Sequence, residues 1–257
     1  MTTLYAGPWI AELGWELFCW QGYLRHRSRH YDKTVIACEQ GHEVLYQDFA
    51  DEIIPVKLNV ERRYCWKARG YKTPEPEQLF GGPLDDGIWY RPNEAVVVYA
   101  KQSINFEQQE FVKLGNNNRN GYDIVVHARC RTLAPNRNWP LKSWHALLHT
   151  CDGATVACIG SKQDALHVAG DDLRGIPLAD LCDVLASSRL IVGPSSGPMH
   201  LASLCGCPQV VWFGEPAYNE RRYKTDWNPL GTPVTTLFQT DWQPSVKTVA
   251  AMIDKAI

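Results

Sequence analysis

Short apolar runs alternate with amphipathic segments along the first half of the chain. An apolar run bounded by Gly, Pro or polar residues predicts a buried strand, whereas apolar residues spaced three and four apart predict a helix. Strands are therefore predicted at residues 3–6, 33–38, 52–56 and 94–100, and helices at 15–31, 43–49 and 105–114. This alternation is typical of α/β domains built on a parallel sheet.

The alternation restarts after a polar stretch, Gly115 to Gly121, which reads GNNNRNG. Strands are predicted beyond it at residues 123–127, 154–159, 189–192 and 209–213, and helices at 143–150, 164–169, 178–186, 199–204 and 245–256. Polar stretches of this kind connect domains. We therefore predict an α/β protein with an N-terminal domain over 1–118 and a C-terminal domain over 119–257.

The turn at residues 193–198, GPSSGP, separates a predicted strand from a short helix. Open α/β sheets bind ligands at the carboxyl ends of their strands, and the first amides of a helix attract anions such as phosphate. Ser195 or Ser196 would cap the helix, and Pro198 suits its first turn. His200 lies where its ring could meet a bound nucleotide or sugar. An ordinary capped crossover without a ligand is the alternative interpretation.

Polar residues follow four predicted strands of the second half. They are His127, Arg129 and Arg131, then Gly160 and Ser161, then the 193–198 turn, and finally Gly214 and Glu215. The carboxyl ends of parallel strands are neighbours, and the planar guanidinium fork suits phosphate. This pattern predicts a diphosphate held between the arginines and the helix that begins near Ser196. Alternatively, the arginines pair with surface carboxylates.

Composition narrows the class of protein. The net charge of −2 lacks the positive excess that is typical of nucleic-acid-binding proteins. None of the nine cysteines forms a CxxC pair, which favours free thiols in a reducing cytosol. The N-terminus has no secretory signal pattern, and no apolar run is long enough for a transmembrane helix. We therefore expect a cytoplasmic protein without a transmembrane segment.

The second half carries the motifs of a known family. These are Arg137-Asn138-Trp139-Pro140-x-x-x-Trp144, an Ile-Gly turn at Gly160, the run from Gly193 to Leu201 (GPSSGPMHL), and VVWFG at 210–214. Together they resemble the nucleotide-sugar half of GT-B glycosyltransferases, and family nine, the heptosyltransferase-like enzymes, in particular. That family reads (D/N)-T-G-x-x-H where this chain has Ser195 to His200, so its acidic first residue is Ser195 here.

The resemblance implies two Rossmann-like αβα domains facing a cleft, with a final helix that packs back on the N-terminal domain. It also implies an inverting sugar transfer from a nucleoside-diphosphate sugar, with no separate cofactor. The donor would contact residues of the matching motifs and strand ends. These are His127, Arg129, Arg131, Arg137, Asn138, Gly160, Ser161, Ser195, Ser196, Gly197, Met199, His200 and Glu215.

The resemblance further implies a catalytic acid in the loop after the first strand. Glu12 is the first candidate for this general base, and Glu16 and Glu39 follow. Glu16 has a simpler interpretation, because an acid in the first helical turn complements the helix dipole. No DxD motif occurs, so arginines and a helix terminus would replace a metal at the diphosphate.

Two other functions fit the same architecture. One is a nucleotide-sugar isomerase of the 2-epimerase type, and the other is a nucleotide-binding module that has lost catalysis. For a transferase, the acceptor hydroxyl could belong to a glycan, a lipid-linked glycan or a modified nucleic acid. The sequence leaves the donor base, the sugar and the acceptor open.

Overall fold

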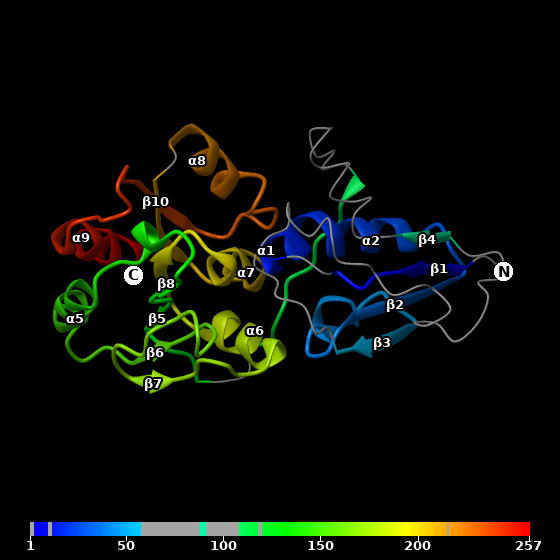
Figure 1. Cartoon of the computed structure of the whole chain (residues 1–257), viewed down its shortest axis with the longest axis horizontal. Coiled ribbons are helices and arrows are strands. Elements are labelled where there is room, and N and C mark those ends of the chain that lie inside the picture. The colour runs from blue at the N-terminus through cyan, green and yellow to red at the C-terminus, as the bar shows by residue number, and fades with distance from the viewer. Residues whose placement is uncertain (1–2, 10–11, 58–87, 91–107, 118–119, 215) are drawn as a thin grey trace. The chain divides into compact units, whose positions relative to one another are not determined.

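The computed structural model describes residues 3–9, 12–57, 88–90, 108–117, 120–214 and 216–257 (Figure 1). The chain divides into two compact units, Met1–Phe111 and Val112–Ile257. Each unit is built on a parallel sheet, which confirms the predicted α/β class. The predicted strand at 94–100 lies outside the described residues, as does Glu215.

The division between the units falls before the polar stretch at 115–121. The amide of Leu114 donates to the carbonyl of Leu204 over 2.9 Å, and the amide of Asn116 donates to Asp183 over 2.8 Å. A Cβ atom on Gly121 would lie 1.7 Å from the carbonyl oxygen of Ser187. The described residues of the polar stretch, 115–117 and 120–121, therefore belong to the second unit, where Asn116 is hydrogen-bonded and Gly121 is closely packed.

Among the residues that the structure describes, the first unit contains a four-stranded parallel sheet in the order β3-β2-β1-β4. Its strands are β1 (Thr3–Ala6), β2 (Lys33–Glu39), β3 (Glu52–Val56) and β4 (Ile88–Tyr90). Residues 34–38 of β2 are all buried, as expected for a parallel strand covered on both faces. Because β2 and β4 flank β1 on opposite sides, the strand order reverses at β1. Such a reversal marks the ligand-binding edge of an open sheet.

The helical run after β1 changes its winding along its length. It consists of α1 (Leu13–Trp15), a π-helical turn η1 (Glu16–Trp20) and α2 (Gln21–Ser28). The predicted helix over 15–31 is therefore confirmed over most of its length, but it begins at Leu13, ends at Ser28 and contains a π-helical turn near its start. The carbonyl of Leu17 accepts the side-chain amide of Gln21 over 2.8 Å, and such a side-chain bond disturbs regular helical pairing.

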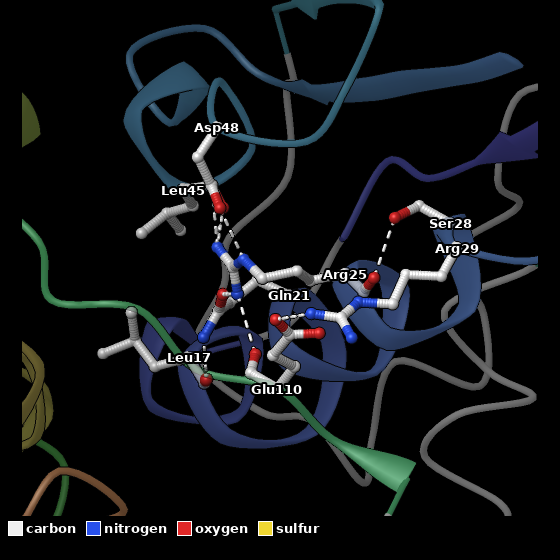
Figure 2. Close-up of polar contacts among 8 residues, drawn as sticks. All are labelled: Leu17, Gln21, Arg25, Ser28, Arg29, Leu45, Asp48 and Glu110. Carbon is white, nitrogen blue, oxygen red and sulfur yellow. Dashed lines mark hydrogen bonds and ion pairs between the residues drawn. The ribbon is translucent and has the colours of Figure 1, made fainter.

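Arg25 on α2 ties three parts of the first unit together (Figure 2). Its side chain is buried, and it forms a bidentate ion pair with Asp48 at 2.7 and 2.9 Å. It also donates to the carbonyls of Leu45 and Glu110, at 3.2 and 2.9 Å, and to Gln21. These bonds join α2 to the 3₁₀ turn η2 (Glu43–Leu45) and to residue 110.

The second unit contains a six-stranded parallel sheet in the order β10-β9-β8-β5-β6-β7. Its strands are β5 (Ile124–Val126), β6 (Val156–Cys158), β7 (Asp171–Asp172), β8 (Ile191–Pro194), β9 (Gln209–Phe213) and β10 (Val234–Phe238). From β5 the chain builds outward through β6 and β7, and then returns to the other side of β5 with β8. The strand order therefore reverses between β5 and β8.

Five α-helices and one 3₁₀ turn accompany this sheet among the residues that the structure describes. They are η5 (Pro135–Arg137), α5 (Leu141–His149), α6 (Leu178–Ser187), α7 (Gly197–Cys205), α8 (Pro216–Lys224) and α9 (Val246–Ala256). The last helix, α9, packs against α5 and β9, and Figure 1 shows α9 beside α5. Its buried residues, Val249 and Ile253, therefore have partners within the second unit.

Two predicted helices are wrong. Of the helix predicted at 105–114, residues 105–107 lie outside the described part of the chain. Residues 109–114 are not helical, and the amide of Glu110 instead donates to the carbonyl of Gly22 over 2.9 Å. Residues 164–169 are not helical either, because their backbone pairs with the segment after β5. The carbonyl of Asp164 accepts from Cys130 over 2.7 Å, and the amide of Leu166 donates to Ala128 over 2.8 Å. Long-range backbone pairing thus replaces the local helical bonds.

Candidate functional site

The carboxyl ends of β5 and β8 meet where the strand order of the second unit reverses. His127 directly follows β5, and its amide donates to the carbonyl of Val192 in β8 over 3.1 Å. Its Nδ1 atom lies 2.9 Å from the hydroxyl of Ser196. This side-chain hydrogen bond spans the position at which doubly wound sheets bind ligands.

His127 is neutral at physiological pH. Burial, together with the charges of Arg129, Arg131 and Arg137, lowers its pKa to about 3. Gly160 packs directly against this ring: it has a φ of 117°, and a Cβ atom there would lie 3.0 Å from Cδ2 of His127. Gly160, which we predicted as a donor contact, therefore leaves room for the ring of His127. Ser161 accepts a hydrogen bond from the amide of Asp164 over 3.0 Å and so shapes the turn after β6.

The serines of the 193–198 turn do not cap α7 with their side chains. Ser196 occupies the N-cap position, but its hydroxyl bonds to His127 instead. The hydroxyl of Ser195 accepts from the phenol of Tyr223 over 2.9 Å. The predicted side-chain cap is therefore wrong, because both hydroxyls have tertiary partners. The turn still presents the amino-terminal end of α7, with Gly197 as its first residue.

Arg129 is directed into the loop that follows it. Its guanidinium donates to the carbonyls of Leu133 and Ala134, at 2.5 and 3.1 Å, and to the side chain of Asn138. Asn138 also bonds the backbone amide and carbonyl of Arg131, at 3.1 and 2.8 Å. Burial lowers the pKa of Arg129 to about 10, which leaves it charged at neutral pH. Arg129 and Asn138 therefore hold the shape of the 131–138 loop.

Arg137 is the arginine that reaches the turn after β8. It donates to the carbonyl of Ser195, and its Cζ atom lies 4.3 Å from the ring centre of Trp242. Arg131, by contrast, is partly exposed and lies 3.6 Å from the carboxylate of Asp164. Arg129 and Arg131, which we predicted to hold the diphosphate together, thus have separate roles, and the alternative of a surface ion pair describes Arg131.

Two further predicted donor residues have different environments. Met199 is completely buried, and a Cβ atom on Gly193 would lie 3.2 Å from its sulfur, so Met199 is a core residue of the turn. His200 is half-buried between aromatic rings, 4.4 Å from Trp227 and 5.5 Å from Tyr223 between ring centres. Burial lowers the pKa of His200 to about 3, helped by the charges of nearby arginines.

The first unit gathers acids at the carboxyl ends of β1 and β2. Glu16 is completely buried; it accepts from the phenol of Tyr46 over 2.8 Å and lies 2.8 Å from Nδ1 of His42. The other ring nitrogen of His42 lies 3.6 Å from Glu39. Glu16 is thus more than an acid near a helix terminus, because it is the centre of a buried polar cluster. Glu12, at the N-cap of α1, is half-buried, and its side chain does not cap the helix.

His42 is a residue that the sequence interpretation missed. Burial alone would lower its pKa, but the charge of Glu16 and the hydrogen bond to it raise the pKa above the usual 6.5. The sequence signal that could have identified His42 is a polar residue shortly after a predicted strand, the same signal that identified His127 in the second half. His42 follows β2 at the ligand-binding edge of a parallel sheet. Tyr223 and Trp242 were also missed, because both lie far along the chain from the motifs that they contact.

Within the part of the chain that the structure describes, no three His, Cys, Asp or Glu side chains are grouped so that they could hold a metal ion. Over the same residues, no helix is both long enough and apolar enough to cross a membrane.

No protein-family model matches the sequence, and no curated protein matches it either. Solved structures do match. Heptosyltransferase WaaC of E. coli, with ADP, aligns with a TM-score of 0.61 at 14% identity over 100% of both chains. A family 9 glycosyl transferase from Veillonella parvula aligns with a TM-score of 0.62 at 13% identity, over 99% of this chain and 96% of its own. ADP-heptose heptosyltransferase II of E. coli gives 0.62 at 16% identity, over 100% and 98%.

This chain has the fold of the heptosyltransferases. The resemblance to GT-B enzymes of family nine that the motifs at 137–144 and 193–201 predict is thereby confirmed at the level of the fold. In this fold the β5–β8 edge is a natural place for a ligand, because strand order reverses there and a helix N-terminus faces it.

Proposed function

We propose that this protein is a glycosyltransferase that moves a sugar from a nucleoside-diphosphate sugar to an acceptor hydroxyl. The observation that carries the proposal is the pairing of His127 with Ser196 at the reversal point of a heptosyltransferase-like sheet. Solved structures of this fold include WaaC with ADP and WaaC with ADP-2-deoxy-2-fluoro heptose. An ADP-sugar is therefore the first donor to test.

The donor diphosphate would bind at the turn after β8. Arg137 supplies a cation beside Ser195, and the amino-terminal end of α7, with Ser196 at the N-cap and Gly197 as its first residue, supplies the positive end of a helix dipole. Both groups can stabilise the charge that develops on a departing diphosphate. Arg129 and Asn138 support this arrangement by fixing the loop that carries Arg137.

The acceptor hydroxyl would lose its proton to a general base on the first unit. Glu16 is completely buried and is hydrogen-bonded to Tyr46 and His42, so it is better suited to holding structure than to contacting a substrate. Glu12 is half-buried in the loop after β1 and remains our first candidate. A positioned base of this kind typically contributes about 10²–10⁴ to the rate.

We further propose that the transfer inverts the anomeric centre and needs no metal. The support is the family resemblance together with the absence of a DxD motif from the sequence. NMR of the glycosylated product would report its anomeric configuration, and the rate should be the same with and without EDTA. A retained configuration, or a rate restored only by a divalent cation, would contradict this part of the proposal.

A thermal-unfolding screen with ADP, UDP, GDP and their sugars tests the donor site directly. A ligand present at about 100 times its dissociation constant should stabilise the protein by roughly 2.7 kcal/mol. Release of nucleoside diphosphate should then require an acceptor. A failure of every diphosphate to bind would reject the proposal, and NMR detection of sugar isomerisation with the donor alone would indicate a 2-epimerase instead.

A further inference from the structure

Trp242 has a backbone conformation that bulky residues rarely adopt. Its φ is 64°, in the left-handed region, and its side chain is only 7% exposed. Ala134 is the other non-glycine residue with a positive φ among those that the structure describes. Both residues lie next to Arg137, since Ala134 precedes the η5 turn that carries Arg137. Conformations of this kind persist where the surrounding structure imposes them, and they gather at ligand sites.

The segment around Trp242 is fastened to the loop of Arg137 by side-chain hydrogen bonds. The side-chain amide of Gln243 donates from Nε2 to the backbone carbonyls of Asn136 and Asn138, at 2.7 and 3.2 Å. The indole of Trp139 donates to the carbonyl of Pro244 over 2.9 Å. The two segments are about a hundred residues apart in the sequence, yet they form one rigid assembly beside the β8 turn.

The indole of Trp242 occupies space that only glycine leaves open. A Cβ atom on Gly214 would lie 2.1 Å from Nε1 of Trp242, so any other residue at position 214 must displace the ring. The ring then stacks on Arg137, whose Cζ atom is 4.3 Å from the ring centre, while Arg137 donates to the carbonyl of Ser195. The guanidinium is therefore held between an aromatic face and a backbone acceptor.

We propose that Trp242 is a positioning residue for the donor diphosphate, an inference that rests on the glycosyltransferase function proposed above. Its indole fixes the guanidinium of Arg137 at the turn after β8 before the donor arrives. An arginine side chain is flexible, and ordering it on binding weakens affinity. Because Trp242 already orders the guanidinium in the free protein, less side-chain entropy is lost when the donor binds. In this role Trp242 acts through Arg137 and does not contact the reacting atoms.

The test is a double-mutant cycle that measures the dissociation constant of ADP by calorimetry. Trp242→Leu keeps an apolar side chain but removes the aromatic face, and should weaken ADP binding by about tenfold, within the range of cation–π energies. Trp242→Phe keeps a ring and should restore most of the affinity. In an Arg137→Gln background, Trp242→Leu should have no further effect, because its action runs through the arginine.

Two more variants separate positioning from folding. Gly214→Ala displaces the indole without deleting it, and should also weaken ADP binding only when Arg137 is present. Leu185→Ala truncates a completely buried side chain of α6 in the same unit, and should lower the unfolding temperature while leaving ADP affinity unchanged. Equal losses for Trp242→Leu with and without Arg137 would overturn the inference but leave the proposed function standing. A wild-type protein that binds neither ADP nor another nucleoside diphosphate would overturn both.

Discussion

The buried His127 should make the stability of this protein fall as the solution is acidified from pH 7 to pH 5. Burial and neighbouring arginines lower its folded pKa to about 3, whereas its unperturbed pKa is 6.5. A lowered pKa means that the folded state favours the neutral ring, so this stabilisation is present above pH 6.5 and is lost as the pH falls toward 3. At pH 5 the unfolded histidine is protonated and the folded one is not, which costs roughly 2 kcal/mol.

Other histidines contribute to the same measurement, so a variant is needed to isolate His127. His200 acts in the same direction, because its pKa is also lowered to about 3. His42 acts in the opposite direction: its pKa is raised, so its contribution is greatest below pH 6.5 and is lost as the pH rises. In His127→Asn, an amide that does not titrate replaces the ring, and the two remaining contributions stay in place.

The assay is urea unfolding at pH 7 and pH 5, followed by tryptophan fluorescence and circular dichroism. The loss of unfolding free energy between the two pH values should be smaller in His127→Asn than in the wild type by roughly 2 kcal/mol. His149→Asn, at an exposed histidine of α5, is the matched control and should leave the loss unchanged. An equal loss in His127→Asn and the wild type would show that His127 accepts a proton in the folded protein, and would refute the reasoning.

Four further predictions concern single residues. Arg129→Ala should lower the free energy of unfolding by roughly 2–4 kcal/mol, since three acceptors lose their donor, and should weaken ADP binding as well; unchanged urea unfolding would contradict it. Glu12→Gln should keep ADP affinity and slow transfer by ~10²–10⁴, measured as acceptor-dependent release of diphosphate. Glu16→Gln should lower the free energy of unfolding by roughly 1–3 kcal/mol and leave the transfer rate largely unchanged. If Glu16→Gln abolished transfer while Glu12→Gln stayed active, Glu16 would be the base. Arg25→Met should lower the free energy of unfolding by roughly 3 kcal/mol, because its buried ion pair and carbonyl bonds are lost, and a stable variant would show that Asp48 needs no partner.

Local pattern was enough to predict seven of the ten strands that the structure describes and the sheet edge at which polar residues gather, but it missed β4, β7 and β10. The runs at 3–6, 52–56 and 209–213 form strands with those bounds. Residues 209–213 are all buried, as expected for a continuous apolar run in a parallel sheet, whereas β3 is an edge strand without a fully buried residue. The polar residues after β5 and β8 do converge, since parallel strands end on the same side. Pattern failed for the helices predicted at 105–114 and 164–169. Residues 109–114 and 164–169 are not helical, because backbone groups of both segments bond to distant parts of the chain.

The tertiary structure decided what each polar side chain does. Nothing in the spacing of Arg129 and Arg137 separates them, yet one bonds the carbonyls of its own loop and the other lies against Trp242 and Ser195. Likewise, Glu16 is buried because Tyr46 and His42, from beyond the next strand, supply its hydrogen bonds. A sequence period determines which face of an element is apolar. The partner of a buried charge depends on which distant segments the fold brings within about 3 Å of it, because hydrogen bonds act only at that range.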